Sequence, residues 1–470
     1  MINTFTSITD HTSRNKSPKE VMKFMPGRLD EVALPQYPVD HRSLPTSLSV
    51  EAIDMCHRTL WHTLETTAYV LPNDETVIIT GDIDDLWLRD SAAQIHPLLV
   101  PNIHDGKSLV QTDAKLERIV SGLIKRTAMY IRFDPYANAF HIDDSKTFNK
   151  FETEQLGRHG FVATYNYELD SACYYMRMLY FFHKSFPKHP IMMEQQTQDA
   201  VEIMIDVWIA EQRHEEDQFA TGPLFDCKHC GKPYRYNPAE LKRQGKGTET
   251  NPNTGMTWSG FRPSDDACEY GYLVPANMFA VVVLQYMEYL ATSLWHNTNL
   301  AKKAKSLRDD IERGIQEHAI VEHERYGLIY AYEVDGLGNS LLMDDANIPN
   351  LMSLPYLGYE YDPEIYENTK RFIMSKDNPT FHEGTNPITG DIGGIDRRMI
   401  ASAFKIISGP WPLPCRDSCP VIKRRKSKPR WARGGCTKLL TRTIHGILED
   451  HGSVGPIHCL HSWLVMSMTN

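Results

Sequence analysis

The stretch YELDSACYYMRMLY, residues 167–180, carries the pattern that decides the fold. Its apolar side chains recur at spacings of three and four, at Leu169, Ala172, Cys173, Met176, Leu179 and Tyr180. This spacing places them on one face of an α-helix. The same periodicity predicts further helices at residues 53–64, 116–124, 200–212, 275–294 and 300–320. Strand-like runs are few and short, such as residues 77–80 and 328–333, so the sequence predicts a mostly α protein.

Three long connections separate the predicted helices, at residues 134–160, 221–262 and 335–349. Loops of this length are uncommon in a compact helical protein and tend to be binding loops. We therefore expect a functional site that is assembled from loops at one rim of a helical frame.

The composition is that of an ordinary globular chain, with 470 residues of which 41% are apolar and 23% are charged. It excludes a disordered tail and a disulfide-stapled miniprotein. The net charge of -10 gives no electrostatic reason to expect nucleic acid or an anionic membrane as a partner.

The charge is distributed unevenly along the chain. Residues 1–395 contain 37 Lys and Arg against 56 Asp and Glu, whereas residues 396–470 contain 13 against 4. Four of the nine cysteines also fall in this last segment. The C-terminal 75 residues therefore differ in composition from the body of the chain.

The first 45 residues or so are rich in Ser, Thr, Pro and charge, which indicates an N-terminal arm. No run approaches the 18 apolar residues of a membrane span, and no signal-peptide pattern is present. As written, the sequence predicts a cytoplasmic protein. An odd number of cysteines without regular spacing argues against a disulfide framework.

The first of four acidic motifs is DIDDLWLRDS, residues 82–91. Trp87 offers a flat apolar face, and Arg89, between carboxylates, offers a fixed fork of donors, a combination that suits sugar binding. A helix start capped by Asp90 or Ser91 explains the same residues equally well.

The second motif is YELDS, residues 167–171. Glu168 and Asp170 can form a substrate-binding pair. Asp170 or Ser171 is also a sound helix cap, and from these residues alone capping is the favoured interpretation.

The third motif is FRPSDDACEY, residues 261–270, in which Asp265 and Asp266 follow Arg262 closely. Adjacent carboxylates can have one pKa raised by burial or by the charged neighbour, as a general acid requires. A helix start with Ser264 as its cap explains part of this pattern.

The fourth motif, MDDANIP at residues 343–349, has the same character, with Asp344 and Asp345. Four acid-rich loops that open helices are what a helical toroid would place around one central pocket. Paired carboxylates then suggest glycoside hydrolysis, in which one carboxyl protonates the leaving oxygen and a second activates water or attacks.

Metal binding is the alternative interpretation. Cys227 and Cys230 form a C-x-x-C pair that can ligate zinc, but no second pair follows in the body of the chain, so a surface loop is the default interpretation. The aspartate clusters lack the D-x-D-x-D-G pattern of a calcium loop.

Taken together and in order, the four motifs resemble glycoside hydrolase family 125 over about residues 50–394. The resemblance implies an (α/α)6 barrel that removes terminal α-1,6-linked mannose with inversion and without a metal ion or other cofactor. The implied partners are mannan or N-glycan fragments, with neither nucleic acid nor a membrane. Asp265 or Asp266 is implied as the general acid, and the sugar subsites are implied to contain Trp87, Arg89, Asp90, Glu168, Asp170, Arg262, Asp344 and Asp345.

The resemblance stops near Ile395. The family's base is a glutamate in a His-Glu-Ser-Phe type motif near the end, and this chain contains no His-Glu-Ser. Glu449 is the only glutamate after residue 395, and its surroundings do not match. We hypothesise a reading-frame error or retained intron that begins near Ile395, which accounts for the charge reversal, the cysteine excess and the basic run at residues 423–430 in one step.

The predicted organisation is therefore an arm at 1–45, a catalytic toroid at 46–395 that is incomplete at its C-terminus, and an aberrant basic tail at 396–470. Without the base, hydrolysis should fall by several orders of magnitude, because inversion has no route that bypasses activated water. Three competing hypotheses are a mannoside-binding protein without catalysis, a metal-dependent hydrolase, and a nucleic-acid binder that uses the basic tail.

Overall fold

The computed structural model describes residues 61–81, 83–101, 106–143, 160–215, 241–386 and 390–395. Helices dominate this part of the chain, which confirms the prediction of a mainly α protein. The long helices are α3 (Leu88–Leu99), α4 (Ala114–Phe133), α6 (Leu169–Ser185), α7 (Gln195–Glu211), α9 (Val274–Ser293), α10 (Thr298–His318) and α12 (Pro363–Ile373). Shorter helical segments are η3 (Leu109–Gln111), η4 (Pro190–Met193), α8 (Lys242–Gly245), η6 (Leu351–Ser353) and α11 (Leu354–Leu357).

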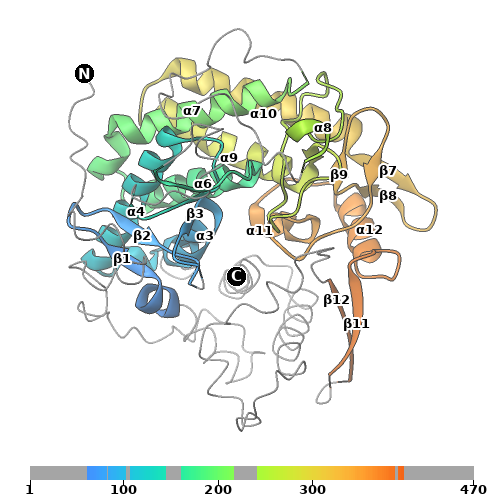
Figure 1. Ribbon diagram of the computed structural model, residues 1–470, viewed down its shortest axis with the longest axis horizontal. Coiled ribbons are helices and arrows are strands. Elements are labelled where there is room, and N and C mark those ends of the chain that lie inside the picture. The colour runs from blue at the N-terminus through green and yellow to red at the C-terminus, as the bar shows by residue number, and fades with distance from the viewer. Residues whose placement is uncertain are drawn as a thin grey trace.

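The helices pack in two rows. Helices α3, α6 and α9 lie side by side in one row, and α4, α7 and α10 lie in the other. Figure 1 shows the chain passing around an arc, from β1, β2 and α3 (blue) through α6 and α7 (green) to α11 and α12 (orange). Because the chain alternates between the rows, each helix of the first row begins after a connection, and these connections carry the acidic motifs.

The strands are short and pair in the antiparallel direction wherever they are described. Two three-stranded sheets, β3–β4–β5 and β10–β9–β6, stand directly before α3 and α9. The strands are β1 (Ala68–Val70), β2 (Thr76–Ile78), β3 (Leu86–Trp87), β4 (Ala139–Phe140), β5 (Val162–Thr164), β6 (Tyr272–Leu273), β7 (Ile320–His323), β8 (Gly327–Tyr330), β9 (Glu333–Val334), β10 (Ser340–Leu341), β11 (Phe381–Asn386) and β12 (Gly390–Ile395).

The apolar periodicity read from the sequence faces the core. On α4 the predicted stripe is fully buried, and the helix begins at Asp113, whose carboxylate accepts a hydrogen bond from Lys115 N at 2.7 Å. On α6 the stripe from Leu169 to Leu179 is buried, whereas Tyr180 is half-buried. Burying each such large aliphatic side chain stabilises the fold by about 1.5–3 kcal/mol, which fixes the helices and thereby the loops between them.

Helix α9 is buried on nearly all sides along most of its length. The helix, Val274–Ser293, is long and apolar enough to cross a membrane by length and composition. Of its most apolar 18-residue window, however, 72% is buried inside the protein. The same length and composition are found in core helices, so α9 is weak evidence for a membrane span. In the fold it forms the end of the first row and positions β6 at the site.

Candidate functional site

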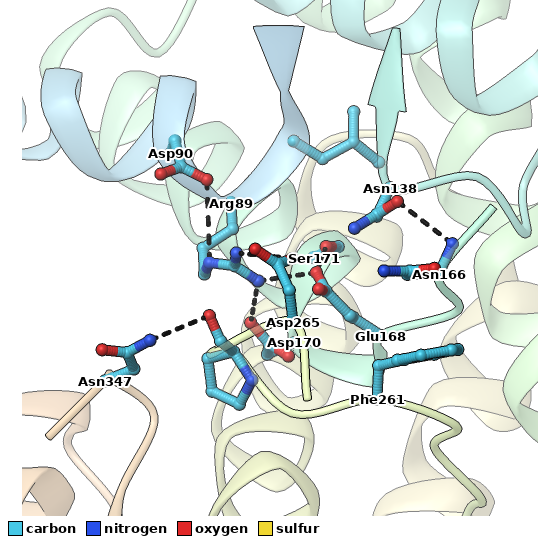
Figure 2. A network of polar contacts seen from close by, with 12 residues as sticks. Arg89, Asp90, Asn138, Asn166, Glu168, Asp170, Ser171, Phe261, Asp265 and Asn347 are labelled. Carbon is cyan, nitrogen blue, oxygen red and sulfur yellow. Dashed lines mark hydrogen bonds and ion pairs between the residues drawn. The ribbon is translucent and has the colours of Figure 1, made fainter. Parts of the chain in front are cut away.

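Arg89, in the first turn of α3, lies at the centre of a buried polar cluster (Figure 2). Its Nη1 donates a hydrogen bond to Glu168 Oε2 at 2.6 Å and lies 3.6 Å from Asp170 Oδ2. Its Nη2 lies 3.7 Å from Asp265 Oδ1, and its Nε lies 3.7 Å from Asp90 Oδ2. One guanidinium therefore joins three of the four motifs recognised in the sequence.

Burial dominates the electrostatics of this cluster. Loss of hydration raises the pKa of Asp90 to about 7 and that of Asp170 to about 6, although Arg89 opposes both shifts. Burial also raises the pKa of Glu168 well above its ordinary value. Burial works to lower the pKa of Arg89, but the surrounding carboxylates outweigh it and hold that pKa well above normal. At neutral pH the cluster can thus hold protons as well as a fixed positive charge.

The capping interpretation of these residues is wrong. Helix α3 begins after Trp87 and α6 begins after Glu168, and neither residue makes a side-chain capping hydrogen bond. Asp90, Asp170 and Ser171 lie inside the first turns, where Ser171 Oγ donates to Glu168 Oε2 at 2.8 Å. The carboxylates of Asp90 and Asp170 also lie 3.7 and 3.6 Å from the Arg89 guanidinium, a partner that the local sequence does not reveal.

Ser264 caps no helix either, since its segment forms a tight turn between Phe261 and Ala267, which pair as an isolated β-bridge. Asp265 N donates to Arg262 O at 2.9 Å, and Arg262 N donates to Asp266 O at 2.8 Å. Asp265 adopts a φ of 64°, in the left-handed region that aspartate tolerates better than most residues.

This turn separates the two adjacent carboxylates. Asp265 faces Arg89 with 43% of its side chain exposed, so it combines contact with the cluster and access for a ligand. Asp266 Oδ2 instead accepts a hydrogen bond from Ser264 Oγ at 3.1 Å. The structure therefore distinguishes two residues that the sequence left equivalent.

Aromatic side chains pack next to the turn that carries Asp265. Trp258 is stacked between Tyr167 and His214, with ring centroids 5.9 Å and 3.7 Å away. Tyr167 O accepts hydrogen bonds from the backbone N–H groups of Gly260 and Phe261 at 3.1 and 3.2 Å. The second motif therefore holds the third through both its backbone and its aromatic ring.

Arg262 points away from the Arg89 cluster. Its Nε donates to Glu333 Oε1 at 2.5 Å, and its guanidinium lies over the Tyr332 ring at 5.5 Å from the centroid. Glu333 Oε2 also accepts from Tyr270 N at 2.8 Å, so this buried carboxylate holds both ends of the segment that carries Asp265. Sequence reasoning missed Glu333, because a single glutamate within a strand-like run carries no motif.

The fourth motif lies behind the turn. Asp344 is fully buried, and its oxygens accept hydrogen bonds from Leu351 N at 2.9 Å and Met352 N at 3.1 Å. Burial raises the pKa of Asp344 to about 8, against the lowering effect of these two N–H groups.

Asp345, also buried, accepts a hydrogen bond from Asn347 N at 2.9 Å. Asn347 Nδ2 in turn donates to Pro263 O at 3.2 Å, as Figure 2 shows. The fourth motif is thus connected to the turn that carries Asp265 through backbone and amide contacts.

The β3–β4–β5 sheet supplies the remaining wall. Trp87 is 9% exposed and packs against Ala139 and Ala163. Asn138 lies just before β4, and its Oδ1 accepts from Thr164 Oγ1 and from Asn166 N. Asn166 stands beside the second motif in the sequence, whereas Asn138 was missed, because a lone Asn within a long loop gives no pattern.

Among the described residues, no group of three or more His, Cys, Asp or Glu side chains is arranged to hold a metal ion. The C-x-x-C pair at Cys227 and Cys230, the basic run at 423–430 and Glu449 lie outside the described residues. The zinc and nucleic-acid hypotheses attached to them therefore stay predictions.

Comparison with known proteins gives a consistent result. A family model described as metal-independent alpha-mannosidase (GH125) matches residues 50–399. That match ends close to Ile395, where the resemblance in the sequence stops.

A curated relative from Schizosaccharomyces pombe, the meiotically up-regulated gene 157 protein, is 35% identical over 353 residues. The match covers 71% of this chain and 64% of that protein, so the chain spans somewhat less than two thirds of its relative. A solved structure of a metal-independent alpha-mannosidase from Streptococcus pneumoniae, in a non-productive complex with alpha-1,6-mannobiose, has a TM-score of 0.62 and 36% identity. That likeness covers 71% of this chain and 74% of the other.

Proposed function

Because the chain belongs to glycoside hydrolase family 125, we propose that the Arg89 cluster is a sugar-binding site for the terminal residue of an α-1,6-linked mannoside. The observation that carries this proposal is the convergence of Asp90, Glu168, Asp170 and Asp265 on one buried guanidinium. A sugar ring presents several hydroxyl groups in fixed directions, and oriented carboxylates are suited to accept hydrogen bonds from them. A site whose carboxylates other than Asp265 are buried suits one terminal sugar, which is consistent with exo-action.

We propose that Asp265 is the general acid. It is half-exposed, held by a turn with an unusual backbone conformation, and adjacent to the carboxylate cluster. In the reaction, the Asp265 carboxyl transfers its proton to the glycosidic oxygen while the bond from that oxygen to the anomeric carbon breaks. A water molecule attacks the opposite face and gives one proton to a base or, where none is present, to the solvent, which inverts the anomeric centre and releases β-mannose.

The other residues implied by the resemblance divide into two groups. Trp87, Arg89, Asp90, Glu168 and Asp170 form the sugar-facing set. Arg262, Asp344 and Asp345 hold the surrounding loops, because their polar atoms contact Glu333 and backbone N–H groups. The family model is described as metal-independent, and the proposed reaction accordingly uses no metal ion.

We further propose that the two helical rows belong to an (α/α)6 barrel that extends over residues 46–395, after an arm at 1–45. The alternation of the chain between the two rows supports it, with α3, α6 and α9 in one row and α4, α7 and α10 in the other. Residues 396–470 are proposed to be an aberrant basic tail, so that the barrel lacks its closing helices.

The water that attacks needs a base, and the chain has no His-Glu-Ser segment to supply it. We therefore propose that this polypeptide binds mannosides and hydrolyses them slowly. The same sequence observation favours a second candidate function, a mannoside-binding protein without turnover. In both cases the Arg89 cluster is the binding site.

The test is calorimetric binding and hydrolysis of α-1,6-mannobiose by the full chain, with α-1,2-mannobiose as the matched control sugar. We expect binding that is selective for the α-1,6 linkage and unchanged by chelator, and we expect any released sugar to be the β-anomer by NMR. No binding would overturn the proposed function, whereas chelator-sensitive turnover would favour the metal-dependent alternative. Binding without any release of mannose would support the second candidate function.

A further inference from the structure

The side-chain amide of Asn138 is buried, with the residue 1% exposed, and it is held in a defined orientation. Its Oδ1 accepts hydrogen bonds from Thr164 Oγ1 and from Asn166 N, the latter at 3.2 Å. Because the backbone N–H of Asn166 can only donate, the atom that it contacts must be the oxygen, and the remaining amide atom must be the nitrogen. The backbone is fixed as well, since Leu88 N donates to Asn138 O at 3.0 Å.

The Asn138 Nδ2 group has no hydrogen-bond acceptor within the described ranges of the chain. A buried donor without a partner destabilises the fold, so natural proteins keep few of them without a reason. Figure 2 shows Asn138 and Asn166 beside the Arg89 cluster, opposite Asn347, with the Asn138 nitrogen directed away from Asn166 and toward the cluster. The unused donor therefore faces the proposed sugar site.

The site needs such a donor. A sugar hydroxyl that donates its proton to a carboxylate still has an oxygen that can accept a hydrogen bond. The cluster is rich in acceptors, with four carboxylates, and the Arg89 fork is already directed at all four of them. A neutral amide N–H is therefore the complementary group for a hydroxyl oxygen within this acidic surrounding.

We propose that Asn138 is a specificity-determining residue, whose Nδ2 donates a hydrogen bond to one ring hydroxyl of the terminal sugar. This inference rests on the proposed function. It makes Thr164 and Asn166 the groups that orient the amide, and it explains why β4 stands between the two segments that carry Arg89 and Glu168. Discrimination arises because a sugar without that hydroxyl leaves the buried donor unpaired.

The experiment measures calorimetric affinities of the full chain for methyl α-mannoside and its 2-, 3-, 4- and 6-deoxy derivatives. Asn138→Leu removes the donor at similar volume, and Asn138→Asp keeps the oxygen that Thr164 and Asn166 contact, in case the leucine variant folds poorly. Asn277→Leu is the matched control, because Asn277 is also fully buried but both of its amide hydrogens are used, by Thr257 O at 3.1 Å and Leu273 O at 2.9 Å.

We expect Asn138→Leu to bind methyl α-mannoside at least about tenfold more weakly than the wild type. For one deoxy sugar, the wild-type and variant affinities should coincide, which identifies the hydroxyl that Asn138 contacts. Asn277→Leu should change the affinities for all five sugars by a common factor.

Equal losses for all five sugars in both Asn138 variants would overturn the inference and leave Asn138 a structural residue. Unchanged binding in both variants would overturn it too. Failure of the wild type to bind any of the sugars would overturn the proposed function itself, and this inference with it.

Discussion

Arg89 Nη1 lies 2.6 Å from Glu168 Oε2, and both side chains are at most 3% exposed although 79 residues separate them in the sequence. This ion pair connects the first turn of α3 to the residue that precedes α6. Removing charged groups from water is expensive, so a pair this deeply buried persists only with close geometry. The same contact therefore affects both the stability of the fold and the geometry of the proposed sugar site.

Replacing Arg89 with methionine should destabilise the protein by about 3–5 kcal/mol, because the carboxylates around it would lose their only cation in the cluster. Mannoside binding should be abolished at the same time. Urea denaturation and calorimetry measure the two effects. Arg89→Lys is the control, since it keeps the charge but not the planar fork, and it should recover stability more than affinity. A stable Arg89→Met protein that binds mannose normally would contradict the assigned site.

Asp265→Asn should lower hydrolysis of α-1,6-mannobiose by about 10²-fold or more, because the leaving oxygen would have no proton donor. The loss should be much smaller for α-mannosyl fluoride, since fluoride departs without protonation. Asp266→Asn is the matched neighbour and should show a small effect that is the same for both substrates. The reverse ranking of the two variants would assign the acid to Asp266.

The stability of the protein should fall as the pH rises from about 4 to about 7. Burial raises the pKa of Asp90 to about 7 and that of Asp170 to about 6 in the folded state, so the folded protein binds more protons than the unfolded chain in this range. Asp90 and Asp170 stabilise the fold fully at a pH below their pKa in the unfolded chain. This stabilisation is lost as the pH rises through their pKa in the folded state.

Each group that keeps its proton in the folded state but is ionised in the unfolded chain contributes a slope of about 1.4 kcal/mol per pH unit. Urea midpoints at a series of pH values measure the slope. Asp90→Asn should flatten it, because the amide does not titrate. A slope that is identical in the variant would show that Asp90 is ionised throughout.

Glu333→Gln should cost about 3–5 kcal/mol, because Arg262 would remain buried without its counter-charge. The double variant Arg262→Met with Glu333→Gln should lose less stability than the two single variants lose in sum, since it leaves no unpaired buried charge. Denaturation of the four proteins of this cycle gives the coupling energy. Strictly additive losses would mean that the pair does not interact in solution.

The order of the four motifs predicted which loops meet, and the structure confirms that residues from three of them contact Arg89. The same local patterns led to the capping interpretation, which failed. Acidic residues near a helix start look alike whether they satisfy backbone N–H groups or a distant guanidinium. Local sequence does not contain the partner that decides between these two outcomes.

The sequence alone determined the mainly helical fold, the core faces of α4 and α6, the family and the three motifs that meet at Arg89. Periodicity and short motifs encode these features because they depend on neighbours a few residues apart. Only the tertiary structure decided that Asp265 faces Arg89 while Asp266 does not, that Glu333 pairs with Arg262, and that Asn138 holds an unused donor at the site. These facts depend on one backbone conformation and on contacts across tens of residues, which emerge only when the helices and loops have packed.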